Sequence, residues 1–356
     1  MTTMTTPKLT AIDCDGHFME RDTEIWPYLE GRYAGRKTGL WPGGQPWDNA
    51  LGGRLGGRYS YAGDRSRRVK TAAEQVALWH ALMDENDIEQ AVLFPTGSGN
   101  IAQLQDLDFA IAASRACNNH FAHDYADARI KPVGVLPMRQ PQAAAEELRR
   151  AATELHLVGF EILTTGLPLA LGDPYYDPVY RAAEECGVAL CVHGTRHGAE
   201  QFGAGGMRTF AEVHAYAFPA GVIMQFTSIL SQAVPIRFPR LRMAFLEIGA
   251  SWLPYYLDRL DEHWEKRCEV DMPLLLQKPS DTFRASNIQI SIEAGETLLG
   301  QTIEYAGAEH FMYATDVPHW DGEFPESLHD LRGRTDLSLE QKQQILSGNA
   351  RQLYRL

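Results

Sequence analysis

Eight short apolar segments, separated by amphipathic stretches of helical length, are the feature that most limits the possible fold. The segments are Leu9–Cys14, Ala91–Pro95, Ile130–Leu136, Val158–Leu163, Ala189–Val192, Leu241–Leu246, Ile288–Ile292 and Phe311–Ala314. Pro141–Leu155, Pro178–Cys186 and Leu253–Glu265 are examples of the stretches between them. Eight strand–helix repeats are typical of a closed parallel barrel, and near-continuous apolar strands are expected where helices cover a parallel sheet. We therefore predict an α/β chain that folds as a TIM-like (β/α)8 barrel.

An open, doubly wound sheet is the rival architecture. It usually carries a Gly-rich phosphate-binding turn after an early strand, and no such turn occurs here. A chain of 356 residues fits one barrel with insertions as well as it fits two ordinary domains. We expect residues 9–356 to form a single barrel domain that follows a flexible tail, residues 1–8.

Charge and cysteine usage limit the possible partners. The net charge of −13 argues against nucleic acid, whose phosphates require a basic surface. The five cysteines include no CxxC pair, which favours reduced thiols in the cytoplasm. No apolar run reaches the ~18 residues of a membrane span, and the Thr-rich start lacks an apolar signal core. We expect a cytoplasmic protein with neither nucleic acid nor membrane as a partner.

Residues 31–70 form a cationic, Gly-rich insertion in this acidic chain. The insertion contains the doubled motif Gly52-Gly53-Arg54 and Gly56-Gly57-Arg58, together with Arg32, Arg36, Arg65, Arg67 and Arg68. One interpretation is a solvated loop or a subunit contact. The other is a lid that brings Arg54 and Arg58 to a carboxylated substrate, because guanidinium groups pair with carboxylates in a bidentate manner.

Four potential metal ligands follow strands one, five and eight of the predicted barrel. Asp15 and His17 end the first strand, where alternation places both side chains on one face, and Gly16 between them permits a close turn. His193 ends the fifth strand, and Asp316 follows the eighth. Taken singly, each has an ordinary interpretation, such as a capping Asp or a structural His. Together they meet at the face where barrel active sites lie, which indicates a metal site.

Three further polar residues are candidates for the same pocket. Glu293 ends the seventh strand and points toward the mouth, and His319 follows Asp316 closely enough to reach the substrate pocket. His214, between the fifth and sixth strands, either reaches the pocket or lies on a helix surface. A structural role is the alternative for each.

Several stretches resemble the amidohydrolase superfamily, in the subgroup of aminocarboxymuconate-semialdehyde decarboxylase and γ-resorcylate decarboxylase. They are Asp13–Glu20, Asp173–Tyr180 leading to His193, Phe238–Arg242, Gly249–Asp261, Tyr313–Gly322 and Gly348–Arg351. This resemblance implies a distorted barrel that holds one divalent ion, usually zinc or manganese. It places the ligands on Asp15, His17, His193 and Asp316, and it implies a homodimer.

The sequence departs from this subgroup just after the sixth strand. Decarboxylases of the subgroup carry a His there, and the resorcylate-type members carry an acidic residue three positions later; this chain has Glu247 and Ala250. Glu247 has three possible roles: a general base held ionised by the metal, a further metal ligand that favours a harder ion than zinc, or a structural carboxylate.

The leading functional hypothesis is a metal-dependent decarboxylase acting on a small aromatic or unsaturated carboxylic acid. Asp316, Glu247 and His319 are the candidate catalytic groups. Arg54, Arg58, His214 and Glu293 are the candidates for substrate binding. The alternative is a hydrolase in which metal-bound hydroxide attacks an amide, a lactone or an activated C–C bond. A catalytically silent scaffold is a third class, which the retention of all four ligand positions disfavours.

Overall fold

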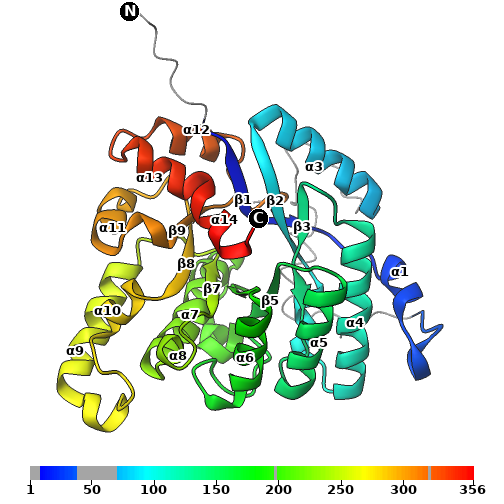
Figure 1. Cartoon of the computed structure of the whole chain (residues 1–356), viewed down its shortest axis with the longest axis horizontal. Coiled ribbons are helices and arrows are strands. Elements are labelled where there is room, and N and C mark those ends of the chain that lie inside the picture. The colour runs from blue at the N-terminus through cyan, green and yellow to red at the C-terminus, as the bar shows by residue number, and fades with distance from the viewer. Residues whose placement is uncertain (1–8, 38–69, 196–198, 320–321) are drawn as a thin grey trace, which may run out of the picture.

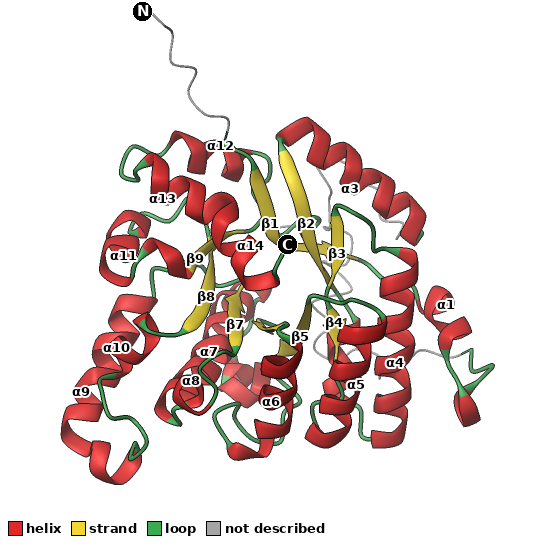
Figure 2. Cartoon of the chain, in the orientation of Figure 1, coloured by secondary structure: helices red, strands yellow, loops and turns green. Residues whose placement is uncertain are grey.

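Parallel strands at the centre of the molecule are surrounded by helices, as Figures 1 and 2 show for the computed structural model. The structure describes residues 9–37, 70–195, 199–319 and 322–356. The strands in these ranges are β1 (Ala11–Phe18), β2 (Ile88–Pro95), β3 (Ile130–Pro132), β4 (Gly134–Val135), β5 (Gly159–Leu163), β6 (Ala189–His193), β7 (Arg242–Leu246), β8 (Asn287–Ile292) and β9 (Phe311–Tyr313). They pair in chain order, β1 to β3 in one sheet and β4 to β9 in another, and each pairing is parallel.

Backbone hydrogen bonds join the two sheets at both junctions. The N–H of Val133, between β3 and β4, donates to the carbonyl of Leu93 in β2 at 2.8 Å. At the other junction, the N–H of His17 in β1 donates to the carbonyl of Val317, beyond β9, at 2.7 Å. The strands thus follow one another around a barrel, and the predicted α/β barrel is confirmed.

Two predicted strands differ in extent from those in the structure. The segment predicted as Ile130–Leu136 is divided into β3 and β4, because Pro132 has no N–H to donate and Val133 turns toward β2. The first strand continues to Phe18 instead of stopping at Cys14, so Asp15 and His17 lie within it. The register between β1 and β2 shifts between Asp13 and Gly16, and this irregularity lets the strand continue.

Helices follow most strands and cover the barrel, as Figure 1 shows. They are α1 (Asp22–Ile25), α3 (Ala72–Asn86), α4 (Leu107–Asp124), α5 (Pro141–Glu154), α6 (Asp177–Cys186), α7 (Phe210–Ser231), α8 (Val234–Arg237), α9 (Leu253–Asp271), α10 (Pro279–Arg284), α11 (Leu299–Ala306), α12 (Glu326–Gly333), α13 (Leu339–Gln343) and α14 (Asn349–Tyr354). Thr71 and Glu74 form a capping box at the start of α3, and Thr209 and Glu212 form one at α7. These reciprocal bonds satisfy N–H groups that a helix start leaves free.

The barrel interior is apolar and is completed by the last helix, α14. Inward side chains of β1, β2, β6, β7 and β9 form one buried cluster with residues of α14. Tyr354 of α14 is 2% exposed, and its hydroxyl donates to the carbonyl of Cys14 at 3.1 Å. Figure 1 shows α14 near the centre of the ring of strands. This helix fills the barrel beneath the strand ends that carry the candidate site.

Helix α7 is the most apolar of the described helices. By length and composition alone, residues Ala211–Ser231 could cross a membrane, but half of the apolar window is buried within the fold. Phe226 of this helix packs edge-on against Phe245 of β7, with ring centroids 5.2 Å apart. The apolar sequence of α7 is therefore used for packing on the barrel.

The predicted tail, residues 1–8, and most of the predicted insertion, including Arg54 and Arg58, lie outside the described residues. At its described start, the Arg32 guanidinium lies 2.8 Å from the Asp108 carboxylate of α4. The Arg36 guanidinium stacks over the Phe109 ring at 3.9 Å. These two arginines contact α4, and their role in substrate binding receives no support from this placement.

Candidate metal centre

Asp15 and His17 present their side chains at the mouth of the barrel from the end of β1. Both are 1% exposed. Their Oδ1 and Nε2 atoms are 3.5 Å apart. Gly16 between them lies against Trp79, since a Cβ built at Gly16 would be 2.4 Å from the indole ring. The alternation of β1 thus brings both side chains to one site, and close packing on α3 holds the strand there.

His193 and Asp316 reach the same point from β6 and from the segment after β9. His193 Nδ1 lies 2.8 Å from the carbonyl of Gly194. This contact directs Nε2 to within 3.6 Å of Asp15 Oδ1. Asp316 Oδ1 lies 3.2 Å from His17 Nε2. Asp316 has a φ of 54°, a left-handed conformation that Asp adopts more readily than most residues. The structure therefore brings together all four predicted ligands.

The donor atoms of Asp15, His17 and His193 form one group that could hold a metal ion, and Asp316 adjoins this group through His17. Ligands about 2.1 Å from one ion lie about 3.0–3.5 Å from each other, and three of the donor separations here, 3.2, 3.5 and 3.6 Å, are close to that range. The buried atoms without a hydrogen-bond partner in the described chain include one donor of each residue: Asp15 Oδ1, His17 Nε2, His193 Nε2 and Asp316 Oδ1. A bound cation would satisfy all four, and two imidazoles with two carboxylates suit zinc or manganese.

Burial and neighbouring charges shift the pKa values of His17, Asp316 and His193 in different directions. Burial lowers the pKa of His17 to about 4, so its imidazole is neutral and able to bind metal. Burial raises the pKa of Asp316, but the charges of His319 and His17 outweigh burial and hold that pKa below its usual range. Burial likewise opposes protonation of His193, yet the carboxylates of Glu247 and Asp15 raise its pKa well above the usual value. A cation bound at His193 would replace that proton.

Glu247 follows β7 and contacts the site through two histidines. Its carboxylate lies 3.1 Å from His193 Nδ1 and 3.6 Å from His319 Nδ1. Its N–H donates to Ser291 Oγ at 3.0 Å. Glu247 has a φ of 68°, a strained conformation of the kind found at functional sites. Burial raises its pKa to about 7, although the charge of His193 lowers it.

The geometry separates Glu247 from the candidate metal ligands. Within the described residues, two sets of three donors lie within 4.8 Å of one another: Asp15–His17–His193 and His17–Asp316–His319. Neither set includes Glu247. The carboxylate instead approaches the Nδ1 edge of His193, opposite Nε2, where carboxylates orient metal-binding histidines in other proteins.

His319 lies beside the ligands. Its ring stacks on that of His17 with centroids 4.0 Å apart, and its Nδ1 is 2.8 Å from Asp316 Oδ1. Burial opposes protonation of His319, but the carboxylates of Asp316 and Glu247 raise its pKa well above the usual value. His319 and Asp316 therefore form a pair that holds a proton next to the ligand cluster.

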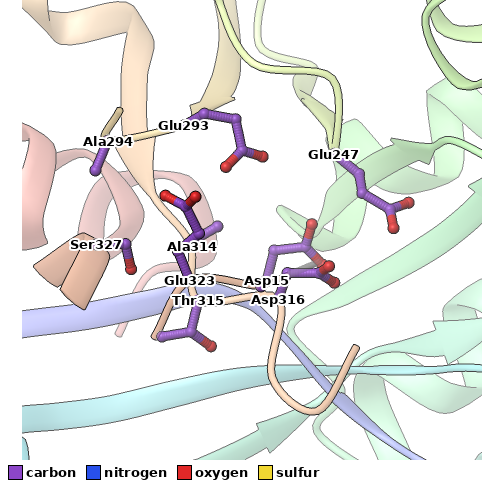
Figure 3. A pocket seen from close by; sticks show the side chains of 10 residues that line it. Asp15, Glu247, Glu293, Ala294, Ala314, Thr315, Asp316, Glu323 and Ser327 are labelled. Carbon is purple, nitrogen blue, oxygen red and sulfur yellow. The ribbon is translucent and has the colours of Figure 1, made fainter. Parts of the chain in front are cut away.

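A cavity of about 90 Å³ opens beside these residues (Figure 3). Its lining residues are Asp15, Glu247, Glu293, Ala294, Ala314, Thr315, Asp316, Gly322, Glu323 and Ser327. The predicted candidate Glu293 is thus placed at the site. His214 is not among the lining residues; its ring packs on Phe218 of α7, with centroids 4.2 Å apart.

Comparison with known proteins identifies the family of this chain. The sequence model described as amidohydrolase matches residues 12–356, almost the whole chain. The chain belongs to the amidohydrolase family.

Two curated relatives are 2-amino-3-carboxymuconate-6-semialdehyde decarboxylase of Dictyostelium discoideum and γ-resorcylate decarboxylase of Rhodococcus jostii. The first is 26% identical over 75% of this chain and 72% of the relative. The second is 27% identical over 67% of this chain and 75% of the relative.

The amidohydrolase fold is also seen in a solved structure, dihydroxybenzoic acid decarboxylase from Polaromonas sp. JS666, determined with bound manganese and the inhibitor 2-nitroresorcinol. It superimposes with a TM-score of 0.73 at 21% identity, covering 98% of each chain. At this identity the likeness concerns the fold.

Sequence reasoning missed two buried carboxyl groups of this amidohydrolase site. Asp13 accepts hydrogen bonds from the N–H and the hydroxyl of Thr315, at 3.0 and 2.6 Å, and from the N–H of Asp15 at 3.2 Å. Glu161, in the middle of β5, is 4% exposed, and its Oε2 has no hydrogen-bond partner in the described chain. Burial raises the pKa of Asp13 to about 7 and that of Glu161 to about 8. The sequence does contain a signal for Glu161, since it is a carboxylate within an otherwise apolar predicted strand.

Proposed function

We propose that this amidohydrolase is a metal-dependent decarboxylase that acts on an aromatic or unsaturated carboxylic acid. The observation that carries the proposal is the grouping of Asp15, His17 and His193 at the barrel mouth, where a buried donor atom of each has no hydrogen-bond partner in the described chain, with Asp316 Oδ1 3.2 Å from His17 Nε2. The printed names of the curated relatives, both decarboxylases, agree with this activity. The manganese in the Polaromonas structure supports a divalent ion of that kind.

In this proposal each residue has a defined task. Asp15, His17, His193 and Asp316 hold the ion, and Glu247 orients His193 and His319. The bound ion would act as a Lewis acid that binds the substrate carboxylate and neutralises negative charge. The His319–Asp316 pair lies beside the ion-binding donors and supplies the proton that the carbon requires.

The reaction exchanges a carboxylate for a proton. A C–H bond forms at the carbon bearing the carboxylate as the proton leaves the His319–Asp316 pair. The C–C bond then breaks, its electrons return to the ring or unsaturated chain, and CO2 departs. A proton from solvent restores the pair, so atoms and charge balance.

The test combines CO2 detection with isotope labelling on a panel of hydroxybenzoates and unsaturated acids. In D2O the product should contain one deuterium at the carbon that loses CO2. Chelation should abolish turnover, and added Mn2+ or Zn2+ should restore it. Consumption of substrate with incorporation of water and without CO2 would instead establish hydrolysis.

The ligand assignment is tested by metal analysis of purified variants. His193→Ala and Asp316→Ala should each lose most of the bound metal. His123→Ala is a matched control, since that side chain lies on α4 and is 75% exposed; its metal content should equal that of the wild type. Full metal content in both ligand variants would refute the assignment.

A further inference from the structure

The turn after β7 carries Glu247 in a backbone conformation that the turn by itself does not favour. Glu247 has a φ of 68° and Gly249 has a φ of 64°, so both lie in the left-handed region. A residue with a Cβ is strained in that region and keeps such a φ only where surrounding contacts impose it. Contacts from outside the turn are therefore needed to hold Glu247 in place.

The Glu296 carboxylate, from the segment after β8, supplies such contacts. Its Oε1 accepts a hydrogen bond from the N–H of Ala250 at 2.9 Å, and its Oε2 accepts from the N–H groups of Ala250 and Ser251 at 3.1 and 2.6 Å. Its Oε1 also accepts from the N–H of Glu293 at 3.0 Å. Hydrogen bonds to a carboxylate are roughly twice as strong as neutral ones. One side chain thus joins the turn after β7 to the turn after β8.

Two further features fix the turn at residues 247–251 to β8 and to the segment that follows it. The N–H of Glu247 donates to Ser291 Oγ at 3.0 Å. At Gly249 the backbone approaches the carboxylate so closely that a Cβ there would lie 2.9 Å from Glu296 Oε1. Glycine at position 249 therefore meets two requirements, the left-handed φ and the close approach of Glu296.

The position of the turn determines how Glu247 contacts the candidate metal centre. The Glu247 carboxylate lies 3.1 Å from His193 Nδ1 and 3.6 Å from His319 Nδ1. A carboxylate at the Nδ1 edge of a metal-binding histidine fixes the orientation of the ring and directs Nε2 toward the ion. A small shift of the turn would lengthen both contacts without altering any of the four candidate ligands.

We propose that Glu296 is a positioning residue that acts on the candidate metal centre through Glu247. Glu296 holds the turn, the turn holds Glu247 beside His193 and His319, and His193 is thereby oriented toward the ion. This inference rests on the proposed function, since it requires that His193 binds the metal. Within the described residues, Glu296 belongs neither to the cavity lining nor to a set of metal donors, so its effect on the metal is indirect.

A double-mutant cycle tests this path. In Glu296→Gln an NH2 group replaces one of the two acceptor oxygens, and it cannot accept from Ala250 or Ser251. Affinity for Zn2+, measured by competition with a chelator, should fall about 10-fold in Glu296→Gln and by a similar factor in Glu247→Gln. The double variant should bind no more than about 2-fold more weakly than the weaker single variant, because the two residues act on one path.

Two results of this cycle would overturn the proposal. Independent losses would multiply to about 100-fold in the double variant, as expected for residues that act separately. Unchanged Zn2+ affinity in Glu296→Gln would show that the turn keeps Glu247 in place without the carboxylate.

A second variant reaches the same contact from the turn. Gly249→Ala places a methyl group against the Glu296 carboxylate and should reproduce the lower Zn2+ affinity of Glu296→Gln. Asp261→Asn is the matched control, because both oxygens of Asp261 accept hydrogen bonds from Ser280, at 2.9 and 2.6 Å, and join α9 to α10. It should keep the wild-type affinity. An equal loss in this control would assign the effect to general stability and contradict the positioning role.

Metal affinity and turnover separate this inference from the proposed function. Coupled losses of Zn2+ affinity without CO2 release from any acid of the panel would support the role of Glu296 and remove the decarboxylase function. With CO2 release, kcat at saturating metal should fall about 10-fold in Glu296→Gln, and no further in the double variant than in Glu247→Gln. Additive losses of kcat would overturn the path from Glu296 through Glu247.

Discussion

The hydroxyl of Thr315 donates a 2.6 Å hydrogen bond to Asp13 Oδ2, although 302 positions separate the two residues in the chain. The bond joins β1 to the segment after β9, close in the chain to the candidate ligands Asp15 and Asp316. A backbone hydrogen bond from Asp316 N to Asp15 O at 3.0 Å runs beside it. These two hydrogen bonds thus fix β1 to the segment after β9 at the place where Asp15 and Asp316 lie.

Removing this contact should loosen the metal centre. We expect Thr315→Val to lower the free energy of unfolding by about 1–3 kcal/mol, because Asp13 keeps a buried acceptor that loses its donor. Metal affinity should fall about 10- to 100-fold, as for other residues that orient ligands. Thr315→Ser retains the hydroxyl and should preserve both. Calorimetric metal titration and chemical denaturation provide the measurements, and unaltered affinity in Thr315→Val would contradict a positioning role.

A methyl group at Gly16 should distort β1. Its Cβ would lie 2.4 Å from the Trp79 ring and 2.7 Å from Asp13 Oδ2. Gly16→Ala should cost about 1–3 kcal/mol of stability through overpacking and should reduce bound metal. At Gly333, at the end of α12, a Cβ would meet nothing within 4 Å. Gly333→Ala should therefore leave melting temperature and metal content close to those of the wild type; equal behaviour of the two variants would disprove the packing argument.

The Glu247→Gln variant should distinguish the three roles that the sequence allows for Glu247: general base, metal ligand and structural carboxylate. Removal of the charge beside His193 and His319 should lower turnover about 10- to 100-fold while the metal remains bound. Elemental analysis and steady-state kinetics measure the two effects, with Glu247→Asp as the charge-preserving comparison. Loss of the metal would indicate a ligand, and undiminished turnover would leave only the structural role.

Glu161 should make stability depend on pH. Burial raises its folded-state pKa from 4.5 to about 8, so between these values the folded protein binds more protons than the unfolded one. Stability should therefore be greatest at low pH and decline as pH rises toward about 8, by on the order of 1.4 kcal/mol per pH unit from this group. Glu161→Gln removes this contribution.

The measurement for Glu161 is denaturation of chelated protein at pH 5 and pH 8, since a bound cation would favour the charged carboxylate. Glu161→Gln should gain stability relative to the wild type at pH 8 much more than at pH 5. An equal difference at both values would show that Glu161 ionises normally.

Much of the site could be predicted because strand ends of a parallel barrel meet at one face. His193 ends an apolar run, and Asp316 follows one. These positions sufficed to predict the cluster without knowledge of any contact. Asp15 and His17 also belong to it, although they lie within β1; alternation gave the correct face and the irregular register kept them at the mouth.

Other features depend on tertiary contacts that periodicity does not encode. The role of Asp13 depends on Thr315, at the opposite end of the chain. The division of the third strand depends on where the N–H of Val133 finds an acceptor. Glu323 reaches the cavity from an irregular segment, and no strand or helix pattern could place it there.

The contact of Tyr354 with Cys14 spans 340 positions and makes the last helix part of the barrel interior. Without α14, the strands would enclose an unfilled apolar core beneath the residues of the candidate metal centre. The candidate metal centre therefore rests on a helix that supplies none of its donor atoms, and loss of α14 should lower metal affinity together with stability.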